Sequence, residues 1–208
     1  MRILMVASEA SPFAKTGGLA DVVAALPRAL VGLGHSVDVV MPRYRGISIG
    51  DSIGQVAVPL GPQVTNTPIY AVTQAGVRTL FVDHPGYYDR DHLYGAAGRD
   101  YPDNPERFAF LSRAALEWAS SAKEPYDAVH AHDWQAGLVP VFLRDFTDTP
   151  ALRAALTMFT IHNLAYQGVF DASWLPRLGL SWSLMHVDAL EYWGQISLLK
   201  GGVMFSRV

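Results

Sequence analysis

The sequence predicts an α/β domain built on a doubly wound, Rossmann-like parallel sheet. Short, continuous apolar runs, typical of strands covered on both faces, alternate with segments that have helical apolar spacing. The first three elements also follow the order strand, helix, strand, which is typical of a right-handed crossover. With 208 residues, half of them hydrophobic, the chain is long enough for one substantial domain with a filled core.

The first crossover unit is the clearest part of the pattern. Ile3 to Ala7 is a continuous apolar run and is predicted to form the first strand. A helix follows, because its apolar residues recur every three or four positions: Leu19, Val22, Val23, Leu26, Leu30 and Leu33. Pro27 predicts a kink or a break in this helix, and Gly32 and Gly34 predict its end. Ser36 to Pro42 is predicted to be the second strand.

The remaining elements are predicted from the same signals. We expect short strands within 56–60 and 68–85, a hairpin turn at Gln74 to Gly76, and a surface loop from Tyr87 to Asn104. A helix should begin at Pro105 and stop before Pro125. Further predictions are a strand within 126–134, helix over 135–146, a strand at 156–161, and a helix over 194–205 that leads toward another strand.

Composition excludes several classes of function. The net charge is −3, with 16 basic and 19 acidic residues scattered along the chain, so we expect no nucleic-acid partner and no anionic membrane partner. The chain has no cysteine, which rules out disulfides and thiolate metal sites and is compatible with the cytoplasm. No window approaches the roughly 20 apolar residues of a membrane-spanning helix. The opening segment reads as a strand and not as a signal peptide.

A glycine pair between the first strand and the first helix predicts an anion site. Gly17 and Gly18 would let a ligand approach the free N–H groups at the helix N-terminus, and Lys15 adds a full positive charge beside them. The alternative is a tight turn with a solvated lysine. Neither GxGxxG nor GxxxxGK follows the first strand, which argues against a dehydrogenase or an NTPase and favours a nucleotide of another kind.

Polar residues also follow two later strands. Because open α/β sheets bind ligands at the carboxyl ends of their strands, the segments "KTGG", "HAHDW" and "HNLAYQG" should meet at one edge. A carboxylate, an imidazole and an amide near aromatic rings suit a polyhydroxylated substrate. Asp133, His162 and Asn163 supply these groups, and the rings are those of Tyr94, Trp134 and Tyr166. The alternatives are that Asp133 caps a helix beginning at Gln135 and that His162 and Asn163 merely cap a strand end.

Two histidines at positions i and i+2 resemble a metal-binding pair. His130 and His132 would point to the same side of a strand, but no third ligand stands at a suitable spacing. We therefore predict that both are hydrogen-bonded core residues and that the chain holds no metal.

Four motifs together resemble a known family. "SEASPFAKTGGLADVVAALP", "VHAHDWQAGLVP", "TIHNLAYQG" and "WGQISLLKGG" occur in the order found in the N-terminal catalytic domain of bacterial glycogen synthase and plant starch synthase. The resemblance implies the N-terminal half of a B-type glycosyltransferase fold. It also implies transfer of glucose from ADP-glucose to the non-reducing end of an α-1,4-glucan with retention. ADP-glucose would be a substrate, and no cofactor is expected.

The resemblance also implies roles for individual residues. His162 and Asp133 would be catalytic, lying beside the transferred glucose. Lys15 would bind the donor phosphates, with Gly17 and Gly18 allowing their close approach. The remaining implied substrate contacts are Asp21, Tyr94 and Asn163.

The resemblance implies that residues 1–208 form one truncated N-terminal domain. Family members continue after "LLKGG" into a nucleotide-binding C-terminal domain, which carries an Arg, a Lys and a Glu at the diphosphate. We therefore expect this domain to be the partner of the chain in the full enzyme and the isolated chain to be inactive. The alternative is a non-catalytic glucan- or nucleotide-binding fragment, while the missing GxGxxG argues against an unrelated Rossmann oxidoreductase. The lack of a transit segment favours a bacterial cytoplasm over a plastid.

Overall fold

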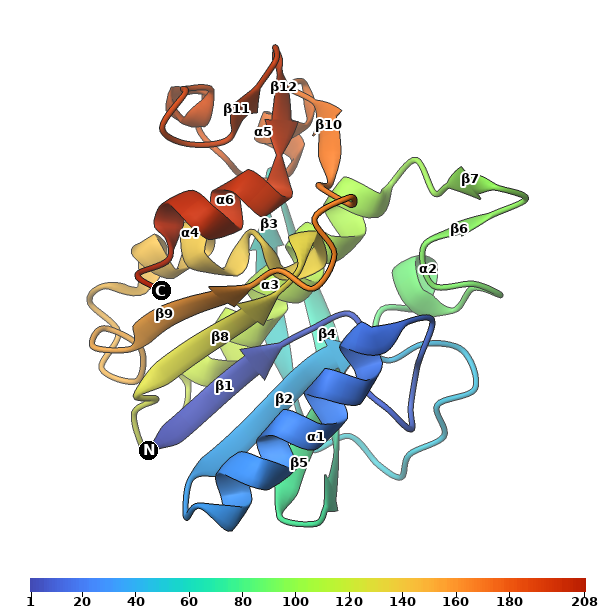
Figure 1. Ribbon diagram of the computed structural model, residues 1–208, viewed down its shortest axis with the longest axis vertical. Coiled ribbons are helices and arrows are strands. Elements are labelled where there is room, and N and C mark those ends of the chain that lie inside the picture. Colours follow the sequence, from blue (N-terminus) through green and yellow to red (C-terminus); the bar gives the residue numbers. More distant parts are fainter.

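The computed structural model describes residues 1–208 and is built around one seven-stranded sheet (Figure 1). The strand order is β3-β4-β5-β2-β1-β8-β9. The strands are β1 (Arg2–Val6), β2 (Ser36–Pro42), β3 (Gly54–Leu60), β4 (Gln63–Gln74), β5 (Val77–Val82), β8 (Ala128–His132) and β9 (Leu156–Thr160). Strands β5, β2, β1, β8 and β9 are parallel, whereas β3 and β4 are antiparallel additions. The predicted parallel sheet is confirmed, with an antiparallel edge beyond it.

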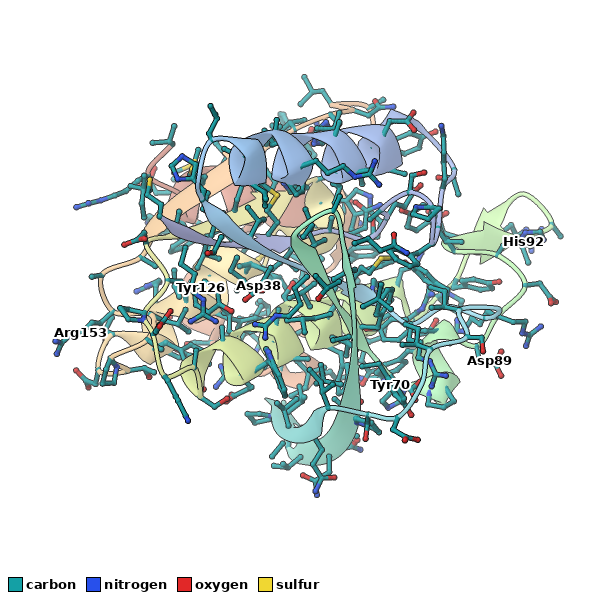
Figure 2. The ribbon with its side chains drawn as sticks, turned by 90° about the horizontal axis from the view of Figure 1, so that it is seen from below. Asp38, Tyr70, Asp89, His92, Tyr126 and Arg153 are labelled. Atoms are coloured by element: carbon teal, nitrogen blue, oxygen red, sulfur yellow. The ribbon has the colours of Figure 1, made fainter.

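Helices cover both faces of the sheet, as the doubly wound prediction requires. Helix α1 (Gly18–Gly32) lies on one face and α3 (Asn104–Ser120) on the other (Figure 2). Helices α4 (Val139–Leu143) and α6 (Leu198–Phe205) pack on each other, and α4 also contacts α3. The smaller elements are α2 (Pro85–Tyr88), β6 (Gly95–Ala96), β7 (Arg99–Asp100), β10 (Val169–Asp171), α5 (Trp174–Arg177), β11 (Glu191–Tyr192), β12 (Gln195–Ser197) and 3-10 turns at Trp134–Ala136, Arg144–Phe146 and Trp182–Leu184.

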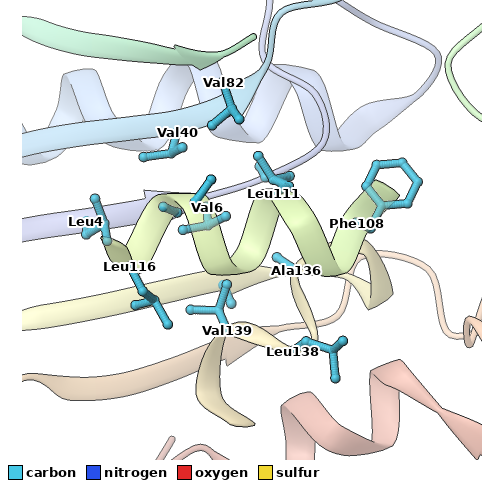
Figure 3. Packing of buried hydrophobic residues seen from close by; sticks show 14 of the residues in the cluster. Leu4, Val6, Val40, Val82, Phe108, Leu111, Leu116, Ala136, Leu138 and Val139 are labelled. Carbon is cyan, nitrogen blue, oxygen red and sulfur yellow. The ribbon is translucent and has the colours of Figure 1, made fainter. Parts of the chain in front are cut away.

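The core lies between the sheet and α3 (Figure 3). Leu4 and Val6 on β1 and Phe108 and Leu111 on α3 are completely buried. The continuous apolar run of β1 is therefore explained by cover on both faces. At roughly 1.5 to 3 kcal/mol for each large apolar side chain, this burial is the main stabilising contribution to the fold.

Three local predictions differ from the structure. Pro27 does not split α1, which runs unbroken to Gly32 and is closed by Gly34 (φ 86°) and the bond from His35 N to Leu30 O. The segment 135–146 is not one helix: a 3-10 turn precedes α4, because Gly137 packs directly on the backbone of Leu198. A strand, β12, precedes α6 where helix was predicted from Gly194.

The predicted surface loop from Tyr87 to Asn104 is only partly exposed. It contains the end of α2 and the β6–β7 hairpin, whose tip is exposed. Tyr88 and Asn104 at its two ends are completely buried. The reason is a buried arginine on α3, described below.

The parallel register brings the carboxyl ends of β1, β8 and β9 to one edge. Val6 pairs with Ala131, and His132 pairs with Thr160. The polar segments that follow these strands therefore meet, as the sequence predicts (Figure 1). No helix of the structure is both long enough and apolar enough to cross a bilayer.

Candidate functional site

A cleft of about 1140 Å³ lies at this carboxyl edge. Its walls come from the loop after β1, from the turn after β8, from the loop after β9, and from Tyr94 and Tyr192. Cofactor- and substrate-sized ligands occupy pockets of roughly this size. Eight of the residues that the sequence singles out for ligand binding line it: Gly17, Gly18, Tyr94, Asp133, Trp134, His162, Asn163 and Tyr166.

The glycine pair stands at the N-terminus of α1 and has open space around it. Gly17 is the N-cap residue, with φ −152° and ψ −162°, an extended backbone that any residue adopts. A Cβ atom built on Gly17 or Gly18 would meet no atom within 4 Å. Neither position requires glycine for steric reasons, and Lys15 is exposed, as the alternative of a solvated lysine expects. No side chain at these two positions covers the N-terminus of α1 on the side of the cleft, as an anion site requires.

Lys15 and Asp21 do not line the cleft. Lys15 Nζ lies 2.7 and 2.8 Å from the two carboxylate oxygens of Asp21, and both side chains are more than half exposed. An exposed ion pair of this kind contributes less than about 1 kcal/mol, so a phosphate group can compete for the ammonium. The roles assigned to these two residues stay predictions.

Glu9 is a site residue that sequence reasoning missed. It is buried, and its carboxylate accepts hydrogen bonds from the Thr16 backbone N–H, from Thr16 Oγ1 at 2.7 Å, and from Tyr94 Oη at 2.5 Å. Glu9 thereby connects the loop before Gly17 and Gly18 to the loop that carries Tyr94. Its position in "SEASPF" gave no signal, because a buried and an exposed glutamate look alike in one sequence.

Tyr94 lines the cleft, and its hydroxyl group contacts two buried side chains, Ser8 and Glu9. Tyr94 Oη also lies 2.7 Å from Ser8 Oγ. Burial, together with nearby Tyr44 and Glu9, raises the pKa of Tyr94 well above its ordinary value. The hydroxyl group therefore stays protonated and can donate to Glu9.

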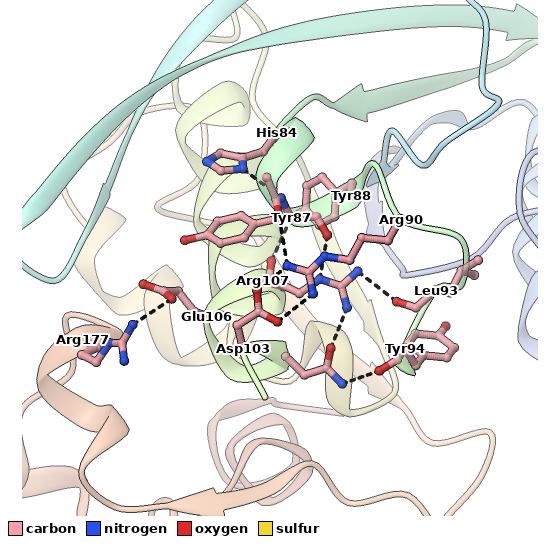
Figure 4. Close-up of polar contacts among 12 residues, drawn as sticks. His84, Tyr87, Tyr88, Arg90, Leu93, Tyr94, Asp103, Glu106, Arg107 and Arg177 are labelled. Carbon is pink, nitrogen blue, oxygen red and sulfur yellow. Dashed lines mark hydrogen bonds and ion pairs between the residues drawn. The ribbon is translucent and has the colours of Figure 1, made fainter. Parts of the chain in front are cut away.

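A buried arginine holds the Tyr94 loop in place (Figure 4). Arg107 on α3 is completely buried, and its guanidinium donates to Tyr87 O at 2.8 Å, Leu93 O at 2.9 Å and Asn104 Oδ1 at 2.6 Å. Asn104 Nδ2 in turn donates to Tyr94 O at 2.8 Å. Burial lowers the pKa of Arg107, but three charge-assisted hydrogen bonds compensate for the lost hydration.

Asp133 holds the loop after β9. Its Oδ1 accepts from His162 N at 2.7 Å and from Asn163 N at 3.4 Å, and it makes no side-chain capping bond to the following turn. The alternative of a helix cap is therefore wrong. Asp133 has φ 56°, which is uncommon for a residue other than glycine and is found at functional sites that surrounding structure over-determines.

His162 is held through its ring as well as its backbone. His162 Nε2 lies 3.0 Å from Nδ1 of His132, which is completely buried. His130 Nε2 lies 2.7 Å from Thr160 Oγ1, so the prediction that His130 and His132 are hydrogen-bonded core residues is confirmed. Burial, together with the neighbouring His162, lowers the pKa of His130 to about 4, and burial lowers that of His132 well below its ordinary value.

Aromatic rings form a further part of the cleft wall. Trp134 packs edge-on to Phe108, with centroids 5.1 Å apart, and its ring lies directly against the backbone of Gly168. Tyr166 is two-thirds exposed on the same wall. Asn163 Oδ1 accepts from Ala165 N at 3.0 Å and shapes the turn between them. This mixture of rings, carboxylate, imidazole and amide is suited to bind a sugar.

The cleft wall contains no lysine and no arginine. Its charged or titratable residues are Glu9, Asp100, Asp133, His162 and the three tyrosines Tyr94, Tyr166 and Tyr192. No group of three or more His, Cys, Asp or Glu side chains is arranged to hold a metal ion. The absence of a metal and of a cofactor stays a prediction.

Comparison with known proteins identifies the family. Residues 2–208 match the family model described as the starch synthase catalytic domain. The chain belongs to this family. The resemblance seen in the sequence motifs is thus confirmed over nearly the whole chain.

Curated relatives in this family are glycogen synthases. The chain is 44% identical to the glycogen synthase of Koribacter versatilis over 99% of its own length and 43% of the relative. It is 46% identical to the glycogen synthase of Anaeromyxobacter dehalogenans, again over 99% of the chain and 44% of the relative. The chain therefore spans less than half the length of these starch synthase family members.

A solved structure of the family agrees with the fold. The catalytic domain of starch synthase IV from Arabidopsis thaliana, bound to ADP and acarbose, superposes with a TM-score of 0.86 at 31% identity. The match covers 99% of the chain and 43% of that structure. The prediction that the chain forms one half of a B-type glycosyltransferase fold is confirmed by this match.

Proposed function

We propose that the chain forms the N-terminal catalytic domain of an ADP-glucose-dependent glycogen synthase. That enzyme transfers glucose to the non-reducing end of an α-1,4-glucan with retention of configuration. The observation that carries the proposal is the convergence of Gly17, Gly18, Tyr94, Asp133 and His162 on one cleft at the carboxyl edge. Family membership supports the reaction class, and the ADP and acarbose bound to the starch synthase IV structure support the two substrates.

The donor diphosphate would lie at the N-terminus of α1. The open space around Gly17 and Gly18 admits a phosphate to the free backbone N–H groups there. Lys15 would leave its exposed pair with Asp21 and add its charge to that site.

The transferred glucose would lie between His162 and Tyr94. His162 offers a ring nitrogen and Asp133 fixes its backbone, so hydrogen bonds to sugar hydroxyl groups need little reorganisation as charge develops at the anomeric carbon. The bond from this carbon to the diphosphate oxygen breaks, a bond to the acceptor hydroxyl oxygen forms on the same face, and the proton of that hydroxyl group passes to the departing diphosphate.

Most of the charge on the departing diphosphate must be neutralised from outside this chain. The cleft wall carries acidic residues and no lysine or arginine. We therefore propose that a second domain, facing the cleft, supplies the cationic groups, and that the 208 residues alone bind substrates without turning them over.

Transfer of labelled glucose from ADP-glucose to glycogen tests the proposal. The assay compares the 208-residue chain with the longest protein that its gene encodes. We expect incorporation by the longer protein and about 100-fold less after His162→Ala, because a group that stabilises the transition state is lost. His92→Ala, at an exposed position outside the cleft, is the matched control. An unchanged rate after His162→Ala would reject the site.

The alternative function is a non-catalytic glucan- or nucleotide-binding module. The absence of cationic residues from the cleft favours this reading for the chain on its own. Calorimetry with ADP and with maltooligosaccharides separates the two: binding by the longer protein without any transfer would support the module.

A further inference from the structure

His132 makes one hydrogen bond and has one buried nitrogen without a partner. Its Nδ1 lies 3.0 Å from His162 Nε2, and its Nε2 is buried with no hydrogen-bond partner. The residue is completely buried at the end of β8. Heavy-atom positions alone do not say which of the two nitrogens in the pair carries the proton.

Either His132 Nδ1 donates to His162 Nε2, or His162 Nε2 donates to His132 Nδ1. The unpartnered Nε2 of His132 decides between these two arrangements. A neutral imidazole carries one N–H, on Nδ1 or on Nε2. If His132 carried its proton on Nε2, a buried N–H would have no acceptor, whereas a proton on Nδ1 makes the bond to His162. Orphaned buried N–H groups are rarer than orphaned acceptors, and the cost of one corresponds to a preference of roughly tenfold or more for the second arrangement.

His132 is neutral in the fold, so both arrangements concern neutral rings. The pKa of His132 is well below its ordinary value because of burial, with the neighbouring His130 and His162 adding to the effect. The His130 ring packs on it at a centroid distance of 4.0 Å, and His130 has its own partner in Thr160. No carboxylate contacts the His132 ring to favour the charged form.

We propose that His132 is a positioning residue that donates from Nδ1 to His162 Nε2 and thereby fixes neutral His162 as its Nδ1–H tautomer. The other ring nitrogen of His162, Nδ1, has no hydrogen-bond partner within the protein, and His162 lines the cleft. His162 therefore presents a hydrogen-bond donor to its ligand and not an acceptor. Resting on the proposed function, the ligand group is an oxygen of the transferred sugar.

Two consecutive residues of the chain thus fix His162 in two ways. Asp133 accepts from the His162 backbone N–H at 2.7 Å, and His132 sets the proton on its ring. The spacing between "HAHD" and "IHN" in the sequence gives no hint of this, because the pairing depends on the parallel register of β8 and β9.

Nitrogen-15 NMR of the 208-residue chain tests the tautomer directly. Two-bond ¹H–¹⁵N correlations of histidine-labelled protein, recorded above pH 7.5, distinguish a protonated from an unprotonated ring nitrogen. We expect His162 to show a protonated Nδ1 and an unprotonated Nε2. The opposite pattern would overturn the proposal.

Two substitutions that are nearly isosteric with each other test the role of His132. In His132→Asn an amide N–H can replace the Nδ1 donor, so the His162 tautomer should be kept. In His132→Asp a carboxylate can only accept, so the proton of His162 should move to Nε2. If the aspartate variant does not fold, His132→Leu removes the partner, and the two tautomers should then interconvert. His130→Asn, which keeps the His132 contact, is the control and should leave the His162 pattern unchanged.

The outcomes separate this inference from the proposed function. A His162 pattern that is unchanged in both His132→Asp and His132→Leu would overturn the positioning role. A switched tautomer without any effect on ADP or maltooligosaccharide affinity would keep the positioning role and reject the sugar-binding role. In the longer protein, we expect glucose transfer to fall by about tenfold or more in His132→Asp and to be rescued in His132→Asn.

Discussion

At the scale of single residues, the fold has room for a side chain at Gly17 and at Gly18, although both positions are glycine. Neither has a neighbour within 4 Å of an added Cβ. We predict that Gly17→Ala and Gly18→Ala change the free energy of unfolding by less than about 1 kcal/mol. If their amides bind a diphosphate, the added methyl group keeps the phosphate out of hydrogen-bond distance of the N–H groups, and ADP binding weakens about tenfold.

Calorimetry and urea unfolding check this prediction together. Gly32→Ala, at the other end of the same helix and also in open space, is the matched control for helix stability. Equal ADP affinity in all three variants would remove the glycines from the binding site.

The buried histidines make stability depend on pH. The pKa of His130 is about 4 in the fold and about 6.5 when unfolded, so the unfolded chain takes up a proton first as the pH falls. The contribution of neutral His130 to the free energy of unfolding is fully present above pH 7 and declines between pH 6.5 and 4. At pH 5 the loss is about 2 kcal/mol from His130 alone.

Urea unfolding at pH 8, 6 and 5 measures this effect. We expect His130→Gln to flatten the decline, whereas replacement of the exposed His92 should leave it as in the parent chain. A decline of the same steepness in His130→Gln would show that other groups cause it.

Sequence reasoning found site residues most directly where polar side chains follow a strand of the main sheet. Asp133 and His162 were found in this way, and both line the cleft. Glu9 and His132 were not assigned to the site, because what matters is their burial and their partners 85 and 30 residues away, which one sequence does not reveal.

At the scale of elements, the loop after β9 depends on close contact between Gly168 and Trp134. Gly168 has φ 59°, and a Cβ atom would lie 2.5 Å from the indole ring. We predict that Gly168→Ala destabilises the fold by about 1 to 3 kcal/mol more than Gly98→Ala. Gly98 is a matched control, since it has φ 74° but open space around it. Both alanine variants therefore carry backbone strain, and only Gly168→Ala adds a clash with a side chain.

Chemical denaturation of the two variants measures this difference. Equal destabilisation would mean that the Trp134 ring moves aside without cost. Indole fluorescence would report such a movement.

The segment from α2 to α3 depends on Arg107. We predict that Arg107→Met destabilises the fold by about 3 kcal/mol, because three buried acceptors lose a charged donor. Amide hydrogen exchange should increase first over residues 87–104, including Tyr94. Arg153→Met, at an exposed position at the edge of the molecule (Figure 2), is the control. Uniform exchange across the whole chain would contradict a local anchor.

Elements with a strong apolar period were predicted well, and the others were not. β1, β2, α1 and α3 lie close to their predicted positions, since burial on the sheet imposes the period. The segment 135–146 has many apolar residues but breaks into short turns, because its backbone must fit against α6. That requirement is tertiary and leaves no period in the sequence.

At the scale of the whole molecule, the sheet has a polar network at the end opposite the cleft. Asp38 on β2 accepts from Arg78 at 2.7 Å and from Tyr126, which lies beside it (Figure 2), and pairs with Arg2 at 3.4 Å. The network joins β1, β2, β5 and the segment before β8. Burial opposes ionisation of Asp38, but the bonds from Arg78 and Tyr126 and the charges of both arginines outweigh it, so its pKa is lowered.

A lowered pKa means that the network stabilises the fold above about pH 4 and that this contribution is lost as the pH falls further. We predict that Asp38→Asn lowers the global free energy of unfolding at pH 7 by about 2 kcal/mol, with a smaller difference from the parent chain at pH 3. Asp148→Asn, at an exposed position, is the control. Urea unfolding at the two pH values checks the prediction, and a pH-independent difference would contradict it.

The overall architecture could be predicted because alternating strands and helices leave few topologies. The parallel pairing of β5, β2, β1, β8 and β9 agrees with that prediction, whereas the order of the strands was not predicted. The antiparallel pair β3–β4 and the small sheet of β10, β12 and β11 could not be placed, since neither lies in a crossover unit.

The loop after β9 is held by hydrogen bonds to the rest of the fold at both ends, and side chains between these anchors are exposed. Asp133 holds His162 and Asn163, while Ser197 Oγ and Leu198 N hold the carbonyls of Gln167 and Gly168. Leu164 and Tyr166 between these anchors are 63% and 66% exposed. A combinatorial library confined to these two positions would diversify the surface of the cleft while the scaffold beneath it stays intact, as in an antibody hypervariable loop.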